Sequence, residues 1–358
     1  MKPFYRVLAV GVFTLAAFVL APAAFATSGT LMITSSTTLT EDHYGSIYIV
    51  ADNVTLDGDG YTVYGPSASG FNGLINVAYT SGVTVKDVTV TGSQVNGLYA
   101  EGGSNLRLEG NTFIGNANHG VHIDSMVGGD IVSNTSRSNQ ALGFVWTRSI
   151  DAWIADNTAM ESGWGGFALF DGSGGSTLVG NTAKGNGQGF IFDHSNGNTA
   201  IANTAQQNTE RGFLIVDASR TVLTNNTSNR NGFEGFLLSA AEDSIITGNT
   251  ANENGDPDQL VYAGFALLNG SSGNQLNSNA ANGNGDVGFV IEASSENTLA
   301  RNVANANGRI GFEVRSGSSF NVIHQNVARN NPVVDASDDQ TGTGNSWTSN
   351  KFGTTSGI

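Results

Sequence analysis

Four side chains that can exchange protons or bind cations recur at regular intervals in the chain. Arg148, Asp171, His194 and Asp217 are evenly spaced, and Asp193 precedes the histidine. An imidazole exchanges protons near neutral pH, and carboxylates serve as acids, bases or cation ligands. Two carboxylates suit hydrolysis of a glycosidic bond, whereas a histidine base with an arginine for a substrate carboxylate suits lysis or epimerisation. These five residues are therefore our candidate catalytic residues.

Aromatic residues near this line could bind the flat faces of sugar rings. Trp164 and Phe170 fall beside the line, and Trp153 is expected to face outward on the next sheet. We predict that all three bind substrate. The same run also fits a ladder of self-paired charges on a solvated turn, with Arg148 beside Asp171 and Asp171 beside His194. Both interpretations stay open.

The even spacing belongs to a repeat that covers most of the chain. A glycine followed by an apolar residue returns once in each unit, and a single longer interval separates Gly235 from Gly264. These glycines are Gly73, Gly97, Gly120, Gly143, Gly166, Gly189, Gly212, Gly235, Gly264, Gly288 and Gly311. Such a repeat indicates a solenoid, in which each unit buries its apolar residues against its neighbours.

Each unit carries short apolar runs that alternate with period two, and none shows the i, i+3, i+4 spacing of a helix. One inward ladder is expected at Phe144, Phe167, Phe190, Phe213, Phe236, Phe265, Phe289 and Phe312. A second is expected at Ile131, Ile154, Leu178, Leu223, Ile246, Leu276, Leu299 and Ile323. Asparagines recur at two corners, where we predict left-handed turn conformations and hydrogen bonds from coil to coil.

These features predict an all-β fold, a right-handed parallel β-helix of about 12 coils with a 23-residue period. A leucine-rich horseshoe would need an L-x-x-L-x-L signature, and a propeller blade would need about 40 residues. The units offer neither.

The motif Gly-Phe-x-Leu with Asn-Thr-Ala and Asn-Gly, opened by Thr38-Leu39 and residues 51–58, resembles the right-handed parallel β-helix repeat superfamily. This superfamily has a pectate-lyase-like scaffold and includes carbohydrate-binding and sugar-hydrolysing domains. Asp338-Asp339, residues 344–347 and Asn350 are similar to its last coil. The resemblance implies the fold and flat sheet faces that hold extended polymers. It carries over no catalytic residue, because the Asp-Pro-His element of bacterial alginate epimerases is absent.

The first residues read as an export signal. Lys2 and Arg6 precede an apolar run over residues 7–20, and Ala24-Phe25-Ala26 fits a cleavage site. We expect a secreted, periplasmic or cell-surface protein without an integral membrane segment after cleavage. The predicted parts are a signal peptide (1–26) and one β-helix domain (27–358), with an N-terminal coil and cap (27–72), regular coils (73–331) and a C-terminal coil and cap (332–358).

The composition restricts the partners. Without Lys2 and Arg6, 13 basic residues stand against 30 acidic ones, a formal charge of about −17. Nucleic acid is excluded as an expected partner, because phosphate binding needs a basic surface. The charge also disfavours strongly anionic polymers unless a cation or a local basic site intervenes. The chain has no cysteine, so disulfides and thiolate metal sites are excluded.

Two metals are considered. Calcium could bind through Asp171, Asp193 and Asp217, or through carboxylates of the last coil at Asp335, Asp338 and Asp339. A related accessory β-helix serves copper loading of nitrous-oxide reductase, so copper is a further alternative. Its candidate ligands here are His119, His122 and Met126.

Two further features concern partners. The position after each strand start is apolar and expected to face outward, which suggests a partner surface or self-association. This stripe is Val145, Ala168, Ile191, Leu214, Leu237, Ala266 and Val290. The one longer interval of the repeat inserts residues 255–262 at a corner, where either a tolerated loop or a binding lip would fit.

Three functions follow from the sequence. The first is binding, with hydrolysis, lysis or epimerisation as an added activity, of a polysaccharide or other glycan on a sheet face. The second is a non-catalytic surface protein, in which the elongated β-helix itself serves a structural or adhesive role. The third and least supported is a periplasmic copper-accessory protein.

Overall fold

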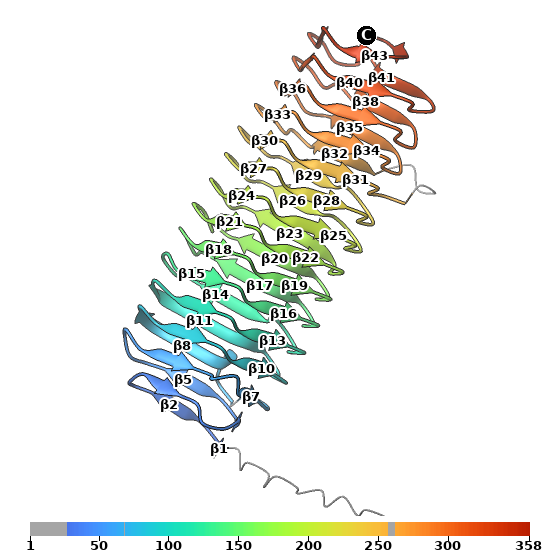
Figure 1. Ribbon diagram of the computed structural model, residues 1–358. Helices are drawn as coiled ribbons and strands as arrows, with labels where there is room; N and C mark the ends of the chain where they lie inside the picture. Colours follow the sequence, from blue (N-terminus) through green and yellow to red (C-terminus); the bar gives the residue numbers. More distant parts are fainter. Residues whose placement is uncertain (1–26, 68, 257–261) are drawn as a thin grey trace, which may run out of the picture.

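The computed structural model describes residues 27–67, 69–256 and 262–358. Over these residues the chain winds as a parallel β-helix with three sheets (Figure 1). Sheets A and B have 15 strands each and sheet C has 14, and each coil contributes to A, B and C in that order. The predicted all-β solenoid is confirmed, with slightly more coils than the 12 expected.

Sheets A and C consist of strands of two or three residues. Sheet A runs from β1 (Thr27–Ser28) to β43 (Lys351–Phe352), and sheet C from β3 (Thr37–Thr38) to β42 (Ser346–Thr348). Sheet B has the longer strands. They are β2 (Leu31–Ile33), β5 (Ile47–Ile49), β8 (Gly73–Ser81), β11 (Asn96–Ser104), β14 (Val121–Asp124), β17 (Leu142–Thr147), β20 (Gly165–Phe170), β23 (Gln188–Asp193), β26 (Phe213–Val216), β29 (Phe236–Ser239), β32 (Ala263–Leu268), β35 (Val287–Glu292), β38 (Ile310–Arg315), β41 (Val334–Asp338) and β44 (Thr355–Ser356).

The core consists of in-register ladders. The eight phenylalanines predicted to point inward are all buried, and consecutive rings from Phe144 to Phe312 stack with centroids 4.6 to 5.1 Å apart. The second predicted ladder, from Ile131 to Ile323 on sheet C, is buried as well. Both predictions are confirmed, because coils that stack in register place like residues on top of one another.

The repeated glycine is required by a close approach between sheets. A Cβ on Gly166 would lie 2.8 Å from the Cβ of Ala183 on sheet A and 2.8 Å from the carbonyl oxygen of Gly189. Gly143, Gly235 and Gly264 face an alanine Cβ at the same 2.8 Å. The glycine ladder therefore packs against an alanine ladder, and any larger residue would force the sheets apart.

The asparagine ladders bond from coil to coil as predicted. Asn157 Nδ2 donates to Asn181 Oδ1, and Asn181 Nδ2 donates to Asn203 Oδ1, at 3.0 and 2.9 Å. The predicted left-handed conformation is wrong for these residues. Positive φ falls on the residue before the ladder position, such as Asp156 (φ 55°) and Ala202 (φ 54°). The asparagines themselves are buried, so their amides replace water as partners of the turn backbone.

The aliphatic stripe predicted to be exposed is covered. Val145, Ala168 and Ile191 are at most 3% exposed and form an apolar cluster with Leu142. Leu237, Ala266 and Val290 belong to a second buried cluster, and Leu214 is half-buried between the two. Leu142 and Val145 would face opposite ways in a straight strand. That both belong to one buried cluster shows that the strand bends. The burial of the stripe removes the predicted basis for self-association.

The bend makes the outer face of sheet B concave. The rings of Trp164 and Phe170, six residues apart, stack with centroids 5.6 Å apart. A straight strand would separate these two positions by about 20 Å. The side chains at the two ends of one strand can therefore meet above its middle.

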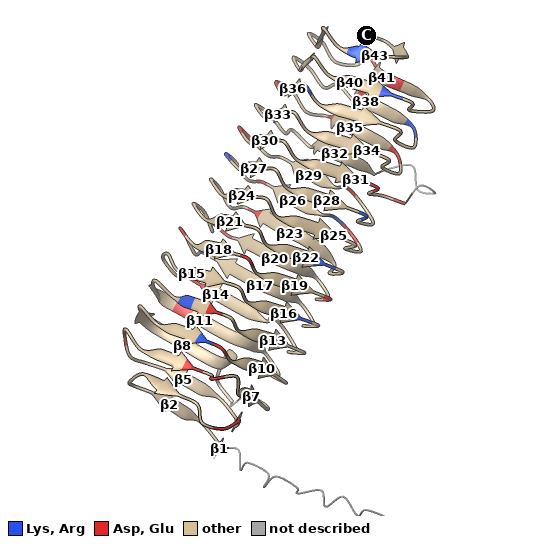
Figure 2. Ribbon diagram, in the orientation of Figure 1, with Lys and Arg blue, Asp and Glu red and all other residues tan. Residues whose placement is uncertain are grey.

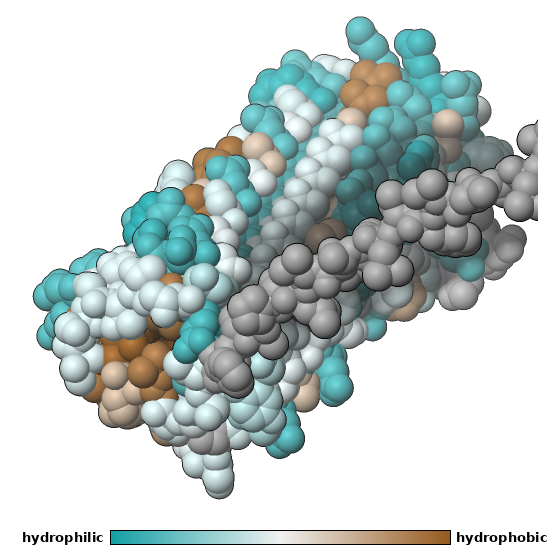
Figure 3. All heavy atoms as spheres, turned by 60° about the horizontal axis from the view of Figure 1, so that its bottom comes forward, coloured by the Kyte–Doolittle hydropathy of each residue, from teal (hydrophilic) through white to brown (hydrophobic). Residues whose placement is uncertain are grey.

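Two parts of the predicted plan lie wholly or partly outside the described residues. Residues 1–26, the predicted signal peptide, lie outside the described residues, as do residues 257–261 of the predicted insertion. The ring of Tyr262, the last residue of that insertion, stacks on the ring of Phe233 with centroids 4.4 Å apart. Figure 3 looks toward the first coil, where apolar core side chains reach the surface. No helix that could cross a membrane occurs in the described ranges.

Candidate functional site

The predicted line of charged residues exists on the turn that follows the strands of sheet B. Arg148, Asp171, His194 and Asp217 all adopt positive φ, between 47° and 52°, and all are exposed. The residues just before them pair in register from β17 to β26, so the four side chains sit on successive coils.

Three members of the predicted site come together around His194. Its Nδ1 forms a 2.5 Å hydrogen bond with Asp193 Oδ1, and its Nε2 lies 3.8 Å from Asp217 Oδ2. The hydrogen bond to Asp193 is the main cause that raises the pKa of His194, with smaller contributions from Asp217 and Asp171. One ligand atom from each of Asp193, His194 and Asp217 lies within 4.8 Å of the others. We call these three residues the Asp–His–Asp group.

The predicted pair of Arg148 with Asp171 is wrong. Arg148 turns toward the preceding coil, where Nη2 lies 2.6 Å from both carboxylate oxygens of Asp124 and Nε donates to Ser125. Asp171 makes no ion pair within the described part of the chain. The backbone register set the line correctly, but a long side chain can reach a neighbouring coil.

The three predicted aromatic residues divide between two faces. Trp164, 49% exposed, stacks on Phe170 over the concave face of sheet B. Trp153, 46% exposed, lies in β18 (Trp153–Ala155) of sheet C, between Asp130 and Thr177 in register. Trp153 faces outward as expected, but it is not joined to the other site residues.

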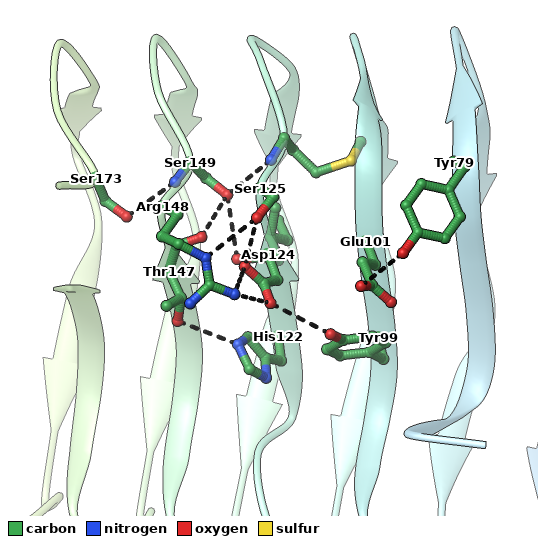
Figure 4. Close-up of polar contacts among 12 residues, drawn as sticks. Tyr79, Tyr99, Glu101, His122, Asp124, Ser125, Thr147, Arg148, Ser149 and Ser173 are labelled. Atoms are coloured by element: carbon green, nitrogen blue, oxygen red, sulfur yellow. Dashed lines mark hydrogen bonds and ion pairs between the residues drawn. The ribbon is translucent and has the colours of Figure 1, made fainter. Parts of the chain in front are cut away.

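A second cluster lies on the same concave face, one to three coils toward the N-terminus from the aromatic stack. Figure 4 shows its members Tyr99, His122, Asp124 and Arg148. The rings of Tyr99 and His122 meet edge to face with centroids 5.1 Å apart, and His119 approaches His122 at 5.4 Å. The Tyr99 hydroxyl donates to Asp124 at 3.3 Å. We call Tyr99, His119, His122, Asp124 and Arg148 the tyrosine–histidine cluster.

Burial sets the protonation states in this cluster. It lowers the pKa of His119 to about 4 and also lowers the pKa of His122. Burial, followed by the charge of Asp124, raises the pKa of Tyr99 to about 12. At neutral pH the cluster therefore presents two uncharged imidazoles and a protonated phenol. Such groups donate and accept hydrogen bonds, and an uncharged imidazole can accept a proton.

Tyr79 and Glu101 extend the polar surface next to the cluster. The Tyr79 hydroxyl, on a residue 74% exposed, donates to Glu101 at 2.9 Å, and this bond raises the pKa of Tyr79. Figure 4 shows both side chains beside Tyr99 and Asp124.

Tyr99 and Asp124 are not among the site residues predicted from the sequence. The informative position lies three residues before the turn position, where the aliphatic stripe was considered only from Val145 onward. There the register pairs Asn76, Tyr99 and His122 before the stripe turns aliphatic at Val145. A polar and aromatic interruption of an aliphatic column was the signal.

The three predicted copper ligands, His119, His122 and Met126, do not form one site. Met126 is 1% exposed and packed in the core, so the predicted thioether ligand cannot reach His119 and His122. His119 Nδ1 already accepts a hydrogen bond from the Leu142 amide, and His122 Nε2 bonds with Thr147. One ring nitrogen of each histidine is left, which makes a poorer donor set than the Asp–His–Asp group.

The calcium ligands predicted in the last coil do not converge. Asp335 accepts hydrogen bonds from Asn331, Asp338 accepts from Trp347, and Asp339 accepts from Thr341. The other predicted calcium set is Asp171, Asp193 and Asp217. In the structure, Asp193 and Asp217 come together with His194 and not with Asp171. The Asp–His–Asp group is the only cluster of three possible metal ligands found in the described ranges.

Comparison with solved structures supports the fold. The mannuronan C-5 epimerase AlgE4 A-module of Azotobacter vinelandii is 16% identical, with 87% of each chain covered and a TM-score of 0.60. A mutant of the periplasmic alginate epimerase AlgG is 15% identical over 85% of this chain and 77% of that chain, with a TM-score of 0.58. The bacteriophage Phi29 gene product 12 N-terminal fragment is 15% identical over 89% and 65%, with a TM-score of 0.68. At such identities the likeness concerns the fold.

Comparison with curated protein sequences finds no match. Two family models match the sequence. The right handed beta helix region matches residues 72–231, which confirms the predicted hand and superfamily. The second model matches residues 168–356, more than half of the chain. By that match the protein belongs to the family described as periplasmic copper-binding protein (NosD).

Proposed function

We propose that this protein binds a polysaccharide chain along the concave outer face of sheet B, outside the cytoplasm. The observation that carries the proposal is the alignment of accessible aromatic and hydrogen-bonding side chains on that one face, from the tyrosine–histidine cluster to the Trp164–Phe170 stack. From β11 to β20 is three coils, or about 14 Å, which suits an extended ligand.

The side chains fit the two demands of a sugar. Exposed rings offer apolar faces for sugar rings, as the Trp164–Phe170 stack does. Tyr99, His119 and His122 are uncharged at neutral pH and can exchange hydrogen bonds with hydroxyl groups. Among the proteins that share the fold, AlgG is a periplasmic alginate epimerase and the AlgE4 module is a mannuronan C-5 epimerase. Together with the periplasmic description of the family, this supports an extracytoplasmic, glycan-directed role.

If the bound chain is also processed, His122 is the residue of the cluster suited to accept a proton. It is uncharged at neutral pH, and its Nε2 bond to Thr147 fixes the ring. Tyr99 would hold its proton and act as a donor.

The two outward tryptophans provide a matched test. We expect Trp164→Ala to weaken binding of a polysaccharide in affinity electrophoresis about 3- to 10-fold, the size of an aromatic contact. Trp153→Ala, equally exposed but on sheet C, should leave binding unchanged. Equal effects of both substitutions would contradict the proposed face. Absence of polysaccharide binding by the wild type would favour the alternative of a structural or adhesive protein.

A second proposed function is transition-metal binding at the Asp–His–Asp group. The family name refers to copper, and imidazole is a good copper ligand. Asp193 holds Nδ1 of His194, so Nε2 is directed toward Asp217. A carboxylate behind a metal-binding histidine orients the ring in this way. Copper would bind there as cargo, with His194 and Asp217 as ligands.

Titration of Cu²⁺ into the chelator-treated protein, followed by calorimetry and electron paramagnetic resonance, tests this site. We expect His194→Gln to abolish one stoichiometric site with a nitrogen ligand. His324→Gln, on β39 (Val322–His324) of sheet C, should leave it intact. Retention of the site in the His194 variant would contradict the assignment.

A further inference from the structure

The arginines on the face proposed to bind glycans already form ion pairs with acidic residues of the protein. Four arginines lie on or next to the strands of sheet B, and each forms an ion pair with a carboxylate from a neighbouring coil. The pairs are Arg148 with Asp124 (2.6 Å), Arg211 with Glu234 (2.8 Å), Arg309 with Asp286 (2.7 Å) and Arg315 with Glu292 (2.8 Å). Figure 2 shows the Lys and Arg residues in blue and the Asp and Glu residues in red along the rod.

These pairs cannot open for a ligand without cost, because the acid is the more buried partner in three of them. The side chains of Asp124, Glu234 and Asp286 are only 10%, 8% and 2% exposed. An arginine that turned to a ligand carboxylate would leave a buried carboxylate without its counter-ion. That loss exceeds what an exposed ion pair with the ligand returns.

The rest of the face is acidic. Glu101, Asp171, Asp193 and Asp217 lie on the strands or turns of sheet B, and His194 is held between carboxylates. Basic side chains for which no ion pair is found lie elsewhere on the described rod. Lys184 and Arg329, for example, end strands β22 (Thr182–Lys184) and β40 (Val327–Arg329) of sheet A. A polyanion on sheet B would therefore meet like charge at close range.

We propose that the concave face of sheet B takes a polysaccharide without acidic groups. This inference rests on the proposed function and separates the protein from the polyuronate-directed enzymes that share its fold. Hydroxyl groups of an uncharged chain would bond to Tyr99, His119 and His122, and its ring faces would meet Trp164. None of these contacts needs a free cation.

The experiment compares uncharged and acidic polymers in calcium-free buffer, with mixed-linkage β-glucan, galactomannan and α-mannan against alginate and polygalacturonate. We expect the wild type to bind at least one uncharged polymer, with less than about a 2-fold change in Kd between about 50 and about 500 mM NaCl. Alginate and polygalacturonate should not bind. Asp124→Asn leaves Arg148 without its partner, and we expect it to gain salt-sensitive binding of polygalacturonate.

The outcomes separate the two proposals. Wild-type binding of a polyuronate more tightly than every uncharged polymer, with loss in Trp164→Ala, would overturn the inference and keep the proposed function. Absence of binding to every polymer would overturn both. Circular dichroism and thermal melting of Asp124→Asn establish that this variant is folded.

Discussion

The guanidinium of Arg148 and the carboxylate of Asp124 form an ion pair between neighbouring coils, with Nη2 2.6 Å from both carboxylate oxygens. The two partners differ in burial: the side chain of Arg148 is 56% exposed and that of Asp124 is 10% exposed. The consequence of breaking the pair therefore depends on which partner is removed, because a buried charge without a partner costs more than an exposed one.

We expect Arg148→Ala to lower the free energy of unfolding by about 1–3 kcal/mol, since it leaves the Asp124 carboxylate buried beside only hydroxyl donors. Asp124→Asn should cost less, because its freed arginine is in contact with water. Urea midpoints measure both. Arg230→Ala breaks an exposed pair with Glu253 and should leave the urea midpoint nearly unchanged. Equal losses for Arg148→Ala and Asp124→Asn would refute the argument from burial.

Acid should destabilise the protein through His119. Burial lowers the pKa of this residue from 6.5 to about 4 in the folded state, so the unfolded chain binds more protons between these values. Stability should therefore fall as the pH drops from about 6.5 to about 4. In His119→Gln this slope should flatten when melting temperatures are measured across the range. A slope identical to that of the wild type would contradict a lowered pKa of His119 in the folded protein.

The asparagine ladder should contribute strongly to stability at a single position. Asn181 donates to Asn203 and to the carbonyl of Ile154, and its Oδ1 accepts from the amide nitrogens of Asn157. Asn181→Ala leaves these buried partners unsatisfied, and we expect a loss of about 2–4 kcal/mol. Asn196→Ala removes an exposed amide that bonds to Ser219 and should change stability by less than about 0.5 kcal/mol. A loss under about 1 kcal/mol for Asn181→Ala would contradict a structural role for the ladder.

Much of the fold could be predicted because residues one repeat period apart occupy equivalent positions in successive coils. Phe144 and Phe167 occupy the same position in successive units and stack at 5.1 Å, so period alone identified the core ladder. The aliphatic stripe was misjudged because alternation assumes a straight strand. The bend places Leu142 and Val145 in one buried cluster, and the stripe is covered. The repeated glycine in each strand of sheet B, which packs against an alanine of sheet A, marks the place where these strands are not straight.

The site was harder to predict than the fold. Period placed Arg148 and His194 on one line, and the structure brings His194 to Asp193 and Asp217. Period cannot fix the rotamer of a long side chain, so the partner of Arg148 was missed. Nor could it indicate that His119 and His122 share a half-buried surface with Tyr99, because that contact depends on the bend at Gly120.

The last prediction ranks the three carboxylates around His194. Its pKa is raised first by the hydrogen bond to Asp193, then by the charge of Asp217, and least by Asp171. A raised pKa means that the interaction stabilises the folded state below the unfolded value of about 6.5 and is lost as the pH rises through the folded value. We expect NMR titration to show the largest decrease in the His194 pKa for Asp193→Asn, a smaller one for Asp217→Asn and the smallest for Asp171→Asn. The resonance is assigned by its absence in His194→Gln. An equal decrease for all three would indicate a diffuse field of carboxylates in place of an oriented imidazole, and it would remove the geometric basis for metal binding at the Asp–His–Asp group.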